Sequence, residues 1–222
     1  VPTRTPKDIL KNVKLEVASG QAVLIGTDQE VGIRYQIADA VIERPGEILL
    51  PTNRVVAILR ELQGDIVDIE STDRGTTIRA DRAEYKLGTE SVAEFPIVAG
   101  FDVSSHHSIA AGVLRQMIRR TLFATDTEST RYALGGVLAD LQGETLTLAA
   151  TDTRRLAVVH GPCASSGGGT SENPMPVIPS KAMQLIERSL TNDTESVGLV
   201  IRANDVLIKT TVATIYSRLV EG

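Results

Sequence analysis

The sequence predicts an α+β protein in which two copies of one domain follow each other along the chain. Three observations predict this class. The 222 residues suffice for two domains of roughly 110 residues, each large enough to bury a core. Short runs alternate apolar and polar residues, as half-buried strands do, while a few longer runs have helical periodicity. Finally, the order of motifs in the first half recurs in the second half.

The internal repeat rests on residues matched at a nearly constant spacing. Residues 10–28 (LKNVKLEVASGQAVLIGTD) align with residues 134–152 (LGGVLADLQGETLTLAATD) at an offset of 124, and both segments end in Thr-Asp. The later matches, at offsets of 128 and 130, pair Ile48–Leu62 with Pro176–Leu190, Val67 with Val197, and Ile78 with Ile208. Loop insertions cause such a small drift, so we expect a first domain over residues 1–98 and a second over residues 104–222.

In the first copy, alternation predicts strands at Lys14–Val17, Ala22–Gly26 and Gly32–Ile37, with a helix after Pro51. Thr52 is the expected N-cap of this helix, as Ser180 is in the second copy. The spacing i, i+3, i+4, i+7 predicts that the helix buries one stripe, formed by Val55, Ile58, Leu59 and Leu62. Further strands are expected at about 65–71, 75–80 and 84–89.

The second copy has an additional helix in front, over about Ser108–Thr125, whose apolar face holds Leu114, Met117 and Ile118. The first copy has no counterpart, so we expect that it lacks an N-terminal helix. A segment rich in Gly, Ser and Pro, Gly161–Pro176, is expected to be an inserted mobile loop. Strands are then expected at 195–202, 205–210 and 212–219.

Composition excludes several classes of protein. No apolar run approaches the roughly 18–20 residues that a membrane span needs, and no secretory leader opens the chain. The lone Cys163 excludes an internal disulfide and fits a reducing compartment, so we expect a cytoplasmic protein. With 23 Lys and Arg against 28 Asp and Glu, the formal net charge is −5, which argues against clamping nucleic acid over the whole surface.

No residue pattern points to catalysis, to a metal or to a cofactor. The two Thr-Asp pairs recur at equivalent strand ends, as turns built by Asp side chains do, and no His or nucleophile accompanies them at a fixed spacing. His106 and His107 are expected in a solvated linker between the domains, and Cys163 as an inert thiol. Gly167–Gly169 lacks the Lys-Ser/Thr that a phosphate-binding loop requires.

The helices are basic although the chain is acidic. The helix before the second copy carries Arg115, Arg119 and Arg120 and no acidic residue. The later helices carry Lys181 and Arg188 in the second copy, and Arg54 and Arg60 in the first. Acidic residues concentrate in strand and loop segments instead. This segregation fits two interpretations equally well. Either the helices face a polyanion, or their charges are merely solvated.

Several motifs, in order, resemble the family of the bacterial sliding clamp, the beta subunit of DNA polymerase III. These are Ile9-Leu10-Lys11-Asn12-Val13, Lys86-Leu87-Gly88-Thr89 with Ala93-Glu94-Phe95-Pro96, Arg131-Tyr132-Ala133-Leu134-Gly135-Gly136-Val137, Ala150-Thr151-Asp152-Thr153-Arg154-Arg155-Leu156-Ala157, and Ser217-Arg218-Leu219-Val220-Glu221-Gly222. The chain departs from the family at Gly135, where Asn is usual, and at Thr153-Arg154, where Gly-His is usual. A β-branched Thr resists positive φ, so a different turn is expected there.

The resemblance implies DNA-clamp domains with antiparallel sheets outside and two helices per complete domain on the inner face. Subunits of this family form a homodimeric ring around duplex DNA, bind it without reading sequence, and tether the replicative polymerase, the clamp loader and other partners. A family subunit has three such domains, so the third is expected to be absent here. The expected DNA-facing residues are Arg54, Arg60, Arg115, Arg119, Arg120, Lys181, Arg188, Arg131 and Tyr132.

By the same resemblance, partner peptides dock in an apolar pocket between the second and third domains. This chain's share of that pocket is expected to be Leu134, Thr151, Thr153, Arg154, Arg155 and Leu156. The alternative hypothesis is a tandem-repeat protein-interaction module without a DNA role, whose Arg residues are only solvated. Binding to nicked circular duplex, compared with linearised DNA, distinguishes the two.

Overall fold

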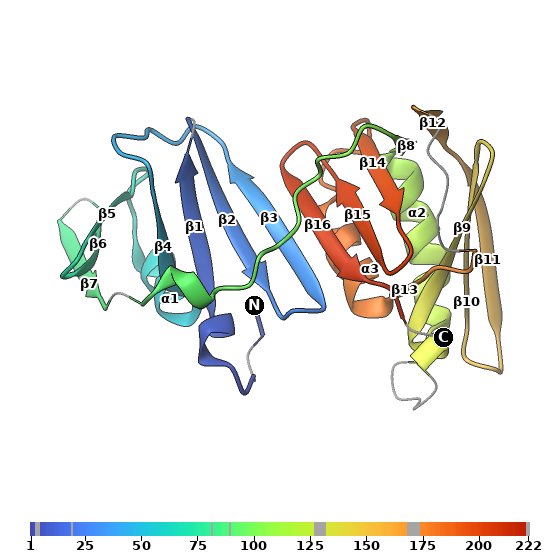
Figure 1. Ribbon diagram of the computed structural model, residues 1–222, viewed down its shortest axis with the longest axis horizontal. Coiled ribbons are helices and arrows are strands. Elements are labelled where there is room, and N and C mark those ends of the chain that lie inside the picture. The colour runs from blue at the N-terminus through green and yellow to red at the C-terminus, as the bar shows by residue number, and fades with distance from the viewer. Residues whose placement is uncertain are drawn as a thin grey trace. The chain divides into compact units, whose positions relative to one another are not determined.

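The computed structural model describes residues 1–2, 5–18, 20–80, 82–88, 90–126, 132–167 and 174–220. The chain divides into two compact units. Unit 1 comprises Val1–Gln29 and Ile33–Val98, and unit 2 comprises Glu30–Gly32 and Ala99–Gly222. Both combine antiparallel sheets with few helices, so the predicted α+β class is confirmed (Figure 1).

The described residues of unit 1 form two sheets and one α-helix. The first sheet has the strand order β3-β2-β1-β4 and the second the order β5-β6-β7. The elements are β1 (Asn12–Ala18), β2 (Gln21–Thr27), β3 (Val31–Ile37), β4 (Gly46–Pro51), α1 (Thr52–Glu61), β5 (Asp68–Thr72), β6 (Gly75–Ala80) and β7 (Ala83–Leu87), with single 3₁₀ turns at Asp8–Lys11 and Val92–Glu94.

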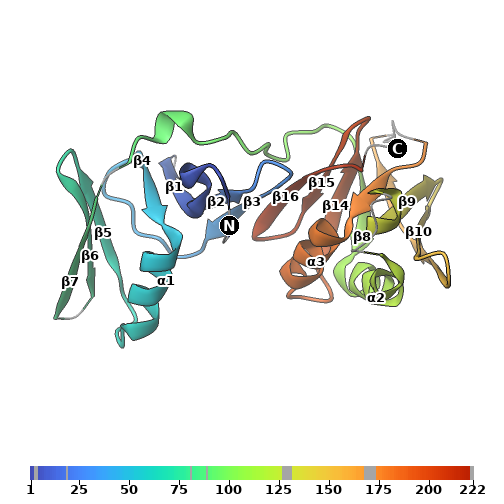
Figure 2. The ribbon, with the colours of Figure 1, turned by 90° about the horizontal axis from the view of Figure 1, so that it is seen from below.

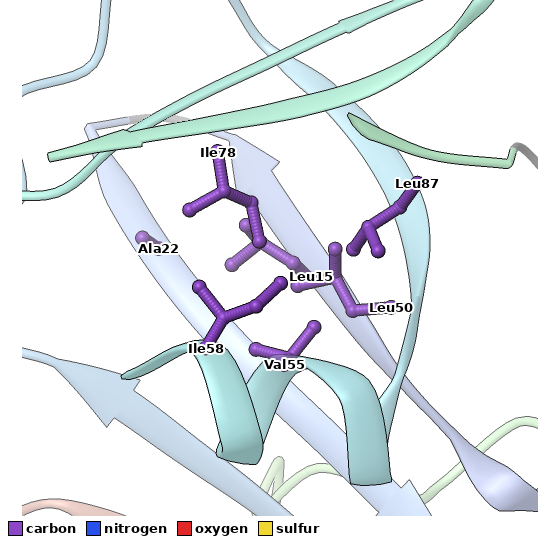
Figure 3. Close-up of a cluster of buried hydrophobic side chains, with 7 residues drawn as sticks. All are labelled: Leu15, Ala22, Leu50, Val55, Ile58, Ile78 and Leu87. Carbon is purple, nitrogen blue, oxygen red and sulfur yellow. The ribbon is translucent and has the colours of Figure 1, made fainter. Parts of the chain in front are cut away.

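The core of unit 1 lies between α1 and the strands of both sheets. Figure 3 shows Val55 and Ile58 of α1 directed toward Leu15 and Leu50 of the first sheet, with Ile78 of the second sheet closing the cluster. Ala22 and Leu87 complete the buried set. One helical turn separates these two α1 residues, which is why one face of the helix fills this space.

In the ranges of unit 2 that the structure describes there are two sheets and two α-helices, and the helices lie side by side on one side of the strands (Figure 2). The strand orders are β12-β8-β14-β15-β16 and β11-β10-β9-β13. The elements are β8 (His106–Ala110), α2 (Ala111–Thr121), β9 (Gly136–Gln142), β10 (Thr145–Thr151), β11 (Leu156–Pro162), β12 (Ala164–Ser166), β13 (Val177–Pro179), α3 (Ser180–Ser189), β14 (Ser196–Ile201), β15 (Asp205–Lys209) and β16 (Ala213–Arg218), with 3₁₀ turns at Leu122–Ala124 and Tyr132–Gly135.

The two helices and two sheets of unit 2 share one core. Buried residues of α2 and α3 meet buried residues of both sheets around a small internal space, lined by Leu114, Ile118, Ala139, Leu146, Leu148, Ile178, Met183, Ile186, Leu199 and Ile208. The residues come from seven elements spread along the sequence of unit 2. Packing between these elements therefore fixes the positions of the two helices relative to the sheets.

The structure corrects the expectation for the start of the first helix in unit 2. Residues 106–110 form strand β8, and helix α2 begins only at Ala111. His107 pairs with Leu199 of β14 and is only 5% exposed, so the expected solvated linker at His106 and His107 is wrong. The segment SSHHSIA shows no clear apolar alternation, and its strand conformation comes from pairing with β14.

Two local expectations were also wrong. Thr52 and Ser180 are the first helical residues of α1 and α3, while Pro51 and Pro179 occupy the N-cap positions without a side-chain cap. Leu59 of α1, expected to be buried, is 47% exposed. Within the described part of unit 1 no second helix lies beside α1, so nothing covers this side chain.

Candidate functional site

The two helices of unit 2 present a charged face on which an ion pair joins one helix to the other. Arg119 of α2 donates from Nε to the Oε1 atom of Glu187 on α3, over 2.7 Å. Arg115, one turn earlier on α2, pairs with Asp193, which follows α3. Because residues four apart share one side of a helix, both arginines lie along the flank of α2 that faces α3 and the segment after it.

Pairing leaves only part of the expected positive charge of this face uncompensated. Arg120 and Arg188 are exposed and form no ion pair within the part of the chain that the structure describes. Lys181, exposed in the first turn of α3, has an interaction of its own. Glu187 stands on the helix face itself. The expectation that acidic residues keep to strands and loops therefore fails on α3, and contacts of this face with a polyanion would be weak.

The other expected DNA-facing residues divide into two groups. In unit 1, Arg54 and Arg60 are exposed on α1, and neither forms an ion pair within the described residues. Arg131, by contrast, lies outside the described residues, as does the side chain of Tyr132. Within unit 2, Arg119 links α2 to α3, and Arg115 links α2 to the segment that follows α3.

A tight loop joins β10 to β11 and holds most of the residues expected in the peptide pocket. Asp152 organises it: one carboxylate oxygen accepts the backbone N–H groups of Arg154 at 3.0 Å and Arg155 at 2.9 Å. The other oxygen accepts the Arg155 Nε–H at 2.8 Å. The Arg155 guanidinium, together with these amides, lowers the pKa of the Asp152 carboxyl. The structural interpretation of the Thr-Asp pair is therefore confirmed for Asp152.

Positive φ occurs at the same point of the loop in both copies of the repeat. Thr153 has φ +74°, and Gln29, its counterpart 124 residues earlier, has φ +80°. In each copy the preceding Thr accepts the backbone N–H through Oγ1: Thr27 from Gln29 at 2.9 Å, and Thr151 from Thr153 at 3.1 Å. Thr153 therefore adopts the positive φ that a β-branched residue was expected to resist, and this hydrogen bond helps to hold it in the left-handed region.

Exposed apolar side chains lie close to the loop in sequence or in space, and the ring of one of them lies near an arginine. Leu156, the first residue of β11, is 69% exposed, and Leu134 is half-buried. The Arg155 guanidinium carbon lies 5.8 Å from the centroid of the Phe123 ring, which is itself exposed at the end of α2. Sequence reasoning missed Phe123. Its signal was an aromatic residue just after the helix in a chain with only three Phe.

Groups that could support catalysis or hold a metal are scarce in the described ranges. Within them, no three His, Cys, Asp or Glu side chains cluster as metal ligands do. Cys163 is buried, and burial raises the pKa of its thiol, which makes the nucleophilic thiolate rarer. No helix in the same ranges is long and apolar enough to cross a membrane.

Both units match models of known protein domains. Residues 1–99 match the N-terminal domain of the DNA polymerase III beta subunit, and residues 108–222 match its central domain. Curated relatives named "Beta sliding clamp" include those of Pseudomonas aeruginosa, 34% identical over 226 residues, and Staphylococcus aureus, 28% identical over 230 residues. These alignments include all of this chain and 60% of each relative, so the chain spans less than two thirds of their length.

Solved structures agree with the sequence comparisons. The DNA polymerase III subunit beta of Pseudomonas aeruginosa superposes with a TM-score of 0.89 at 32% identity. The DNA polymerase sliding clamp of Bacillus subtilis superposes with a TM-score of 0.90 at 28% identity. Both superpositions include all of this chain and 60% of the solved chain.

Proposed function

The chain belongs to the family of the DNA polymerase III beta subunit, and we propose that it forms part of a sliding clamp, the processivity factor of a replicative DNA polymerase. The observation that carries this proposal is the match of both units, in order, to the N-terminal and central domains of that subunit. The relatives that share 60% of their length with this chain bear the name of the clamp.

In this proposal the helix faces contact the phosphates of duplex DNA. The basic residues of α2 and α3 supply the contacts in unit 2, and Arg54 and Arg60 supply them in unit 1. Compensation of Arg115 by Asp193 and of Arg119 by Glu187 keeps each contact weak. Weak, sequence-independent phosphate contacts suit a protein that must slide, because tight binding to one register would stop it.

The partners follow from the same proposal. A homodimeric ring encircles the DNA, and the polymerase, the clamp loader and other proteins dock through short peptides at the loop that carries Thr151, Thr153, Arg154, Arg155 and Leu156, with Leu134 beside it. The chain acts in the cytoplasm, binds no cofactor and performs no chemical step itself. Its contribution is to hold a catalytic partner on the template.

The phosphate contacts can be tested on the chain itself. We expect a short DNA duplex to shift NMR resonances on α2 and α3, by similar amounts for unrelated DNA sequences. The double substitution Arg120→Gln, Arg188→Gln should weaken binding and reduce the slope of log K against log salt concentration by about 2. Arg82→Gln, which removes one exposed arginine of unit 1, is the single-charge control away from the helices.

Two results would reject this proposal. One is an effect of the control half as large as that of the double variant, because the binding would then reflect only total charge. The other is the absence of any shift on the helices, which would favour the tandem-repeat protein-interaction module with merely solvated arginines. A strong dependence on DNA sequence would contradict phosphate recognition.

A further inference from the structure

The two ion pairs of α2 differ in which partner is open to solvent. Arg115 and Arg119 lie one turn apart on the same flank of the helix, and each binds one acidic side chain. The Arg115 side chain is only 18% exposed while that of its partner Asp193 is 66% exposed. The Arg119 side chain is 67% exposed while that of its partner Glu187 is 23% exposed. The arginine is therefore enclosed in the first pair and accessible in the second.

Arg115 belongs to the contact that joins the start of α2 to the segment after α3. The backbone N–H of Gly112 donates to the carbonyl oxygen of Asp193 at 2.9 Å, and that of Ala111 donates to the carbonyl oxygen of Glu195 at 2.9 Å. A Cβ atom at Gly112 would lie 3.1 Å from the Cβ atom of Asp193, so the two segments approach closely. An enclosed guanidinium in such a contact presents little of its surface to a ligand.

Arg119, by contrast, keeps most of its hydrogen-bond donors available. A guanidinium has five N–H groups. Among the described residues, Arg119 donates only from Nε, to the Oε1 atom of Glu187 over 2.7 Å. The four N–H groups on its two Nη atoms therefore remain for a ligand. These two atoms form the end of the guanidinium fork, which can bind two oxygens of one phosphate.

Glu187 has two opposing effects on this guanidinium. Its carboxylate lowers the local positive charge, which weakens the attraction of a phosphate. Its hydrogen bond also restricts the orientation of the Arg119 side chain, because Glu187 is itself half-buried on α3. A side chain that is already oriented loses less conformational entropy when it binds. An acidic residue can thus favour a phosphate contact by geometry while it limits the strength of that contact by charge.

We propose that Arg119 makes the closer phosphate contact of the two paired arginines, and that Glu187 is the positioning residue that orients it. The two Nη groups of Arg119 bind two oxygens of one phosphate. The charge of Glu187 keeps this contact easy to break as the protein moves along DNA. Arg115 chiefly joins α2 to the segment after α3. This inference rests on the proposed sliding-clamp function and names the residue that tunes its DNA-binding face.

A charge-neutral double variant tests the contact. Arg119→Gln, Glu187→Gln removes one positive and one negative charge, so the formal net charge stays at −5. In an NMR titration with a short DNA duplex at several salt concentrations, we expect the slope of log K against log salt concentration to fall by about 1. The matched control is Arg79→Gln, Glu84→Gln, which removes an exposed Nε–carboxylate pair of unit 1 and should leave the slope unchanged.

Two single variants test the positioning role. Glu187→Gln and Glu187→Ala remove the same charge, but only glutamine keeps an oxygen that accepts the Nε–H of Arg119. Both variants should bind the duplex more tightly than the unchanged chain does, because a negative charge has left the face. The glutamine variant should bind about two-fold more tightly than the alanine variant. In the unchanged chain, the duplex should shift the side-chain Nε–H resonance of Arg119 more than that of Arg115.

The possible failures are distinguishable. Equal binding by the two Glu187 variants, or tighter binding by the alanine variant, would overturn the positioning role. A shift of the Arg115 resonance as large as that of Arg119 would overturn the division between the two arginines. An unchanged slope in the charge-neutral variant, while Arg120→Gln, Arg188→Gln still lowers it, would overturn the contact by Arg119 and leave the clamp proposal intact. No binding of the duplex by the unchanged chain would reject the proposed function itself.

Discussion

Two strands that occupy the same place in the repeat differ sharply in burial. Ile69 on β5 of unit 1 is 41% exposed, whereas Leu199, its counterpart 130 residues later on β14 of unit 2, is 2% exposed. β14 lies between β8 and β15, while β5 is at the edge of its three-stranded sheet and pairs with β6. Similar apolar residues are thus buried only where a neighbouring strand and helix cover them.

Equivalent positions on the helices α1 and α3 also differ according to what lies beside them. Leu59 of α1 corresponds to Glu187 of α3 at the offset of 128 residues. Glu187 binds Arg119 on the adjacent helix α2, whereas Leu59 is exposed where unit 1 has no counterpart of α2 among its described residues. The repeat therefore preserves the backbone fold, while each copy adapts the residues at its surface to its own neighbours.

The largest expected difference between the units lies in these two strands. Leu199→Ala should lower the free energy of unfolding of unit 2 by about 3 kcal/mol, because it leaves a cavity in a closed core. Ile69→Ala should lower that of unit 1 by about 1 kcal/mol or less, because water already reaches this side chain. Hydrogen exchange measured by mass spectrometry, read separately on peptides from each unit, checks both values. Equal losses would contradict the comparison.

The stability of unit 2 should depend on pH through His107, which lies on strand β8. Burial, and secondarily His106, lowers the pKa of His107 below its ordinary value of 6.5. The unfolded chain therefore takes up a proton that the folded unit resists, so stability is lost as the pH falls through 6.5 toward the folded pKa. Urea unfolding of unit 2 between neutral and mildly acidic pH should show this slope. His107→Leu should flatten it, and an unchanged slope in that variant would assign it elsewhere.

The repeated positive-φ position offers a smaller effect. Thr153→Gly should stabilise unit 2 by about 1 kcal/mol, because glycine adopts the left-handed backbone without the strain that a β-branched residue has there. The larger conformational entropy of glycine in the unfolded chain offsets only part of this gain. Gln29→Gly in unit 1 should change stability by less than about 0.5 kcal/mol, since an unbranched residue is strained less. Thermal unfolding measures both, and a destabilised Thr153→Gly would show that the turn is not strained.

The smallest effect is expected on the helix surfaces. Leu59→Glu should change the stability of unit 1 by no more than about 0.5 kcal/mol, because an exposed side chain loses little burial. Glu187→Leu should cost unit 2 a similar amount, since it removes an exposed ion pair with Arg119. Chemical denaturation of both variants checks this. A loss of more than about 2 kcal/mol from Leu59→Glu would mean that the face of α1 that carries Leu59 is covered.

Sequence patterns predicted what depends on local periodicity. The apolar spacing of α1 located Val55 and Ile58 in the core, and the Thr-Asp pair was correctly interpreted as a turn built by Asp152. Strand β8 was not predicted, because its conformation depends on pairing with β14. The two strands are distant in sequence: Ser108 and Ser196, whose side chains are in contact, are 88 residues apart. The exposure of Leu59 was not predicted, because periodicity shows which face of a helix is apolar but not whether another element covers that face.

The candidate site was predicted in part. The loop residues were located through the resemblance, but the pairing that distinguishes Arg155 from Arg154 depends on side-chain geometry around Asp152. Likewise, the basic residues of α2 and α3 were visible in the sequence, whereas their compensation by Asp193 and Glu187 required the two helices to be side by side. Charge counts alone cannot reveal which charges remain available to a partner.

The central claim is that this chain supplies part of a clamp that encircles duplex DNA. The most direct measurement replaces the matching 60% of the Pseudomonas aeruginosa relative with residues 1–222 and follows retention of the hybrid on nicked circular duplex in the presence of the clamp loader. We predict that the hybrid stays on the circle and is lost when the DNA is linearised, as for the unchanged relative. Equal retention on both forms, or no retention by a folded hybrid while the relative is retained, would contradict the account.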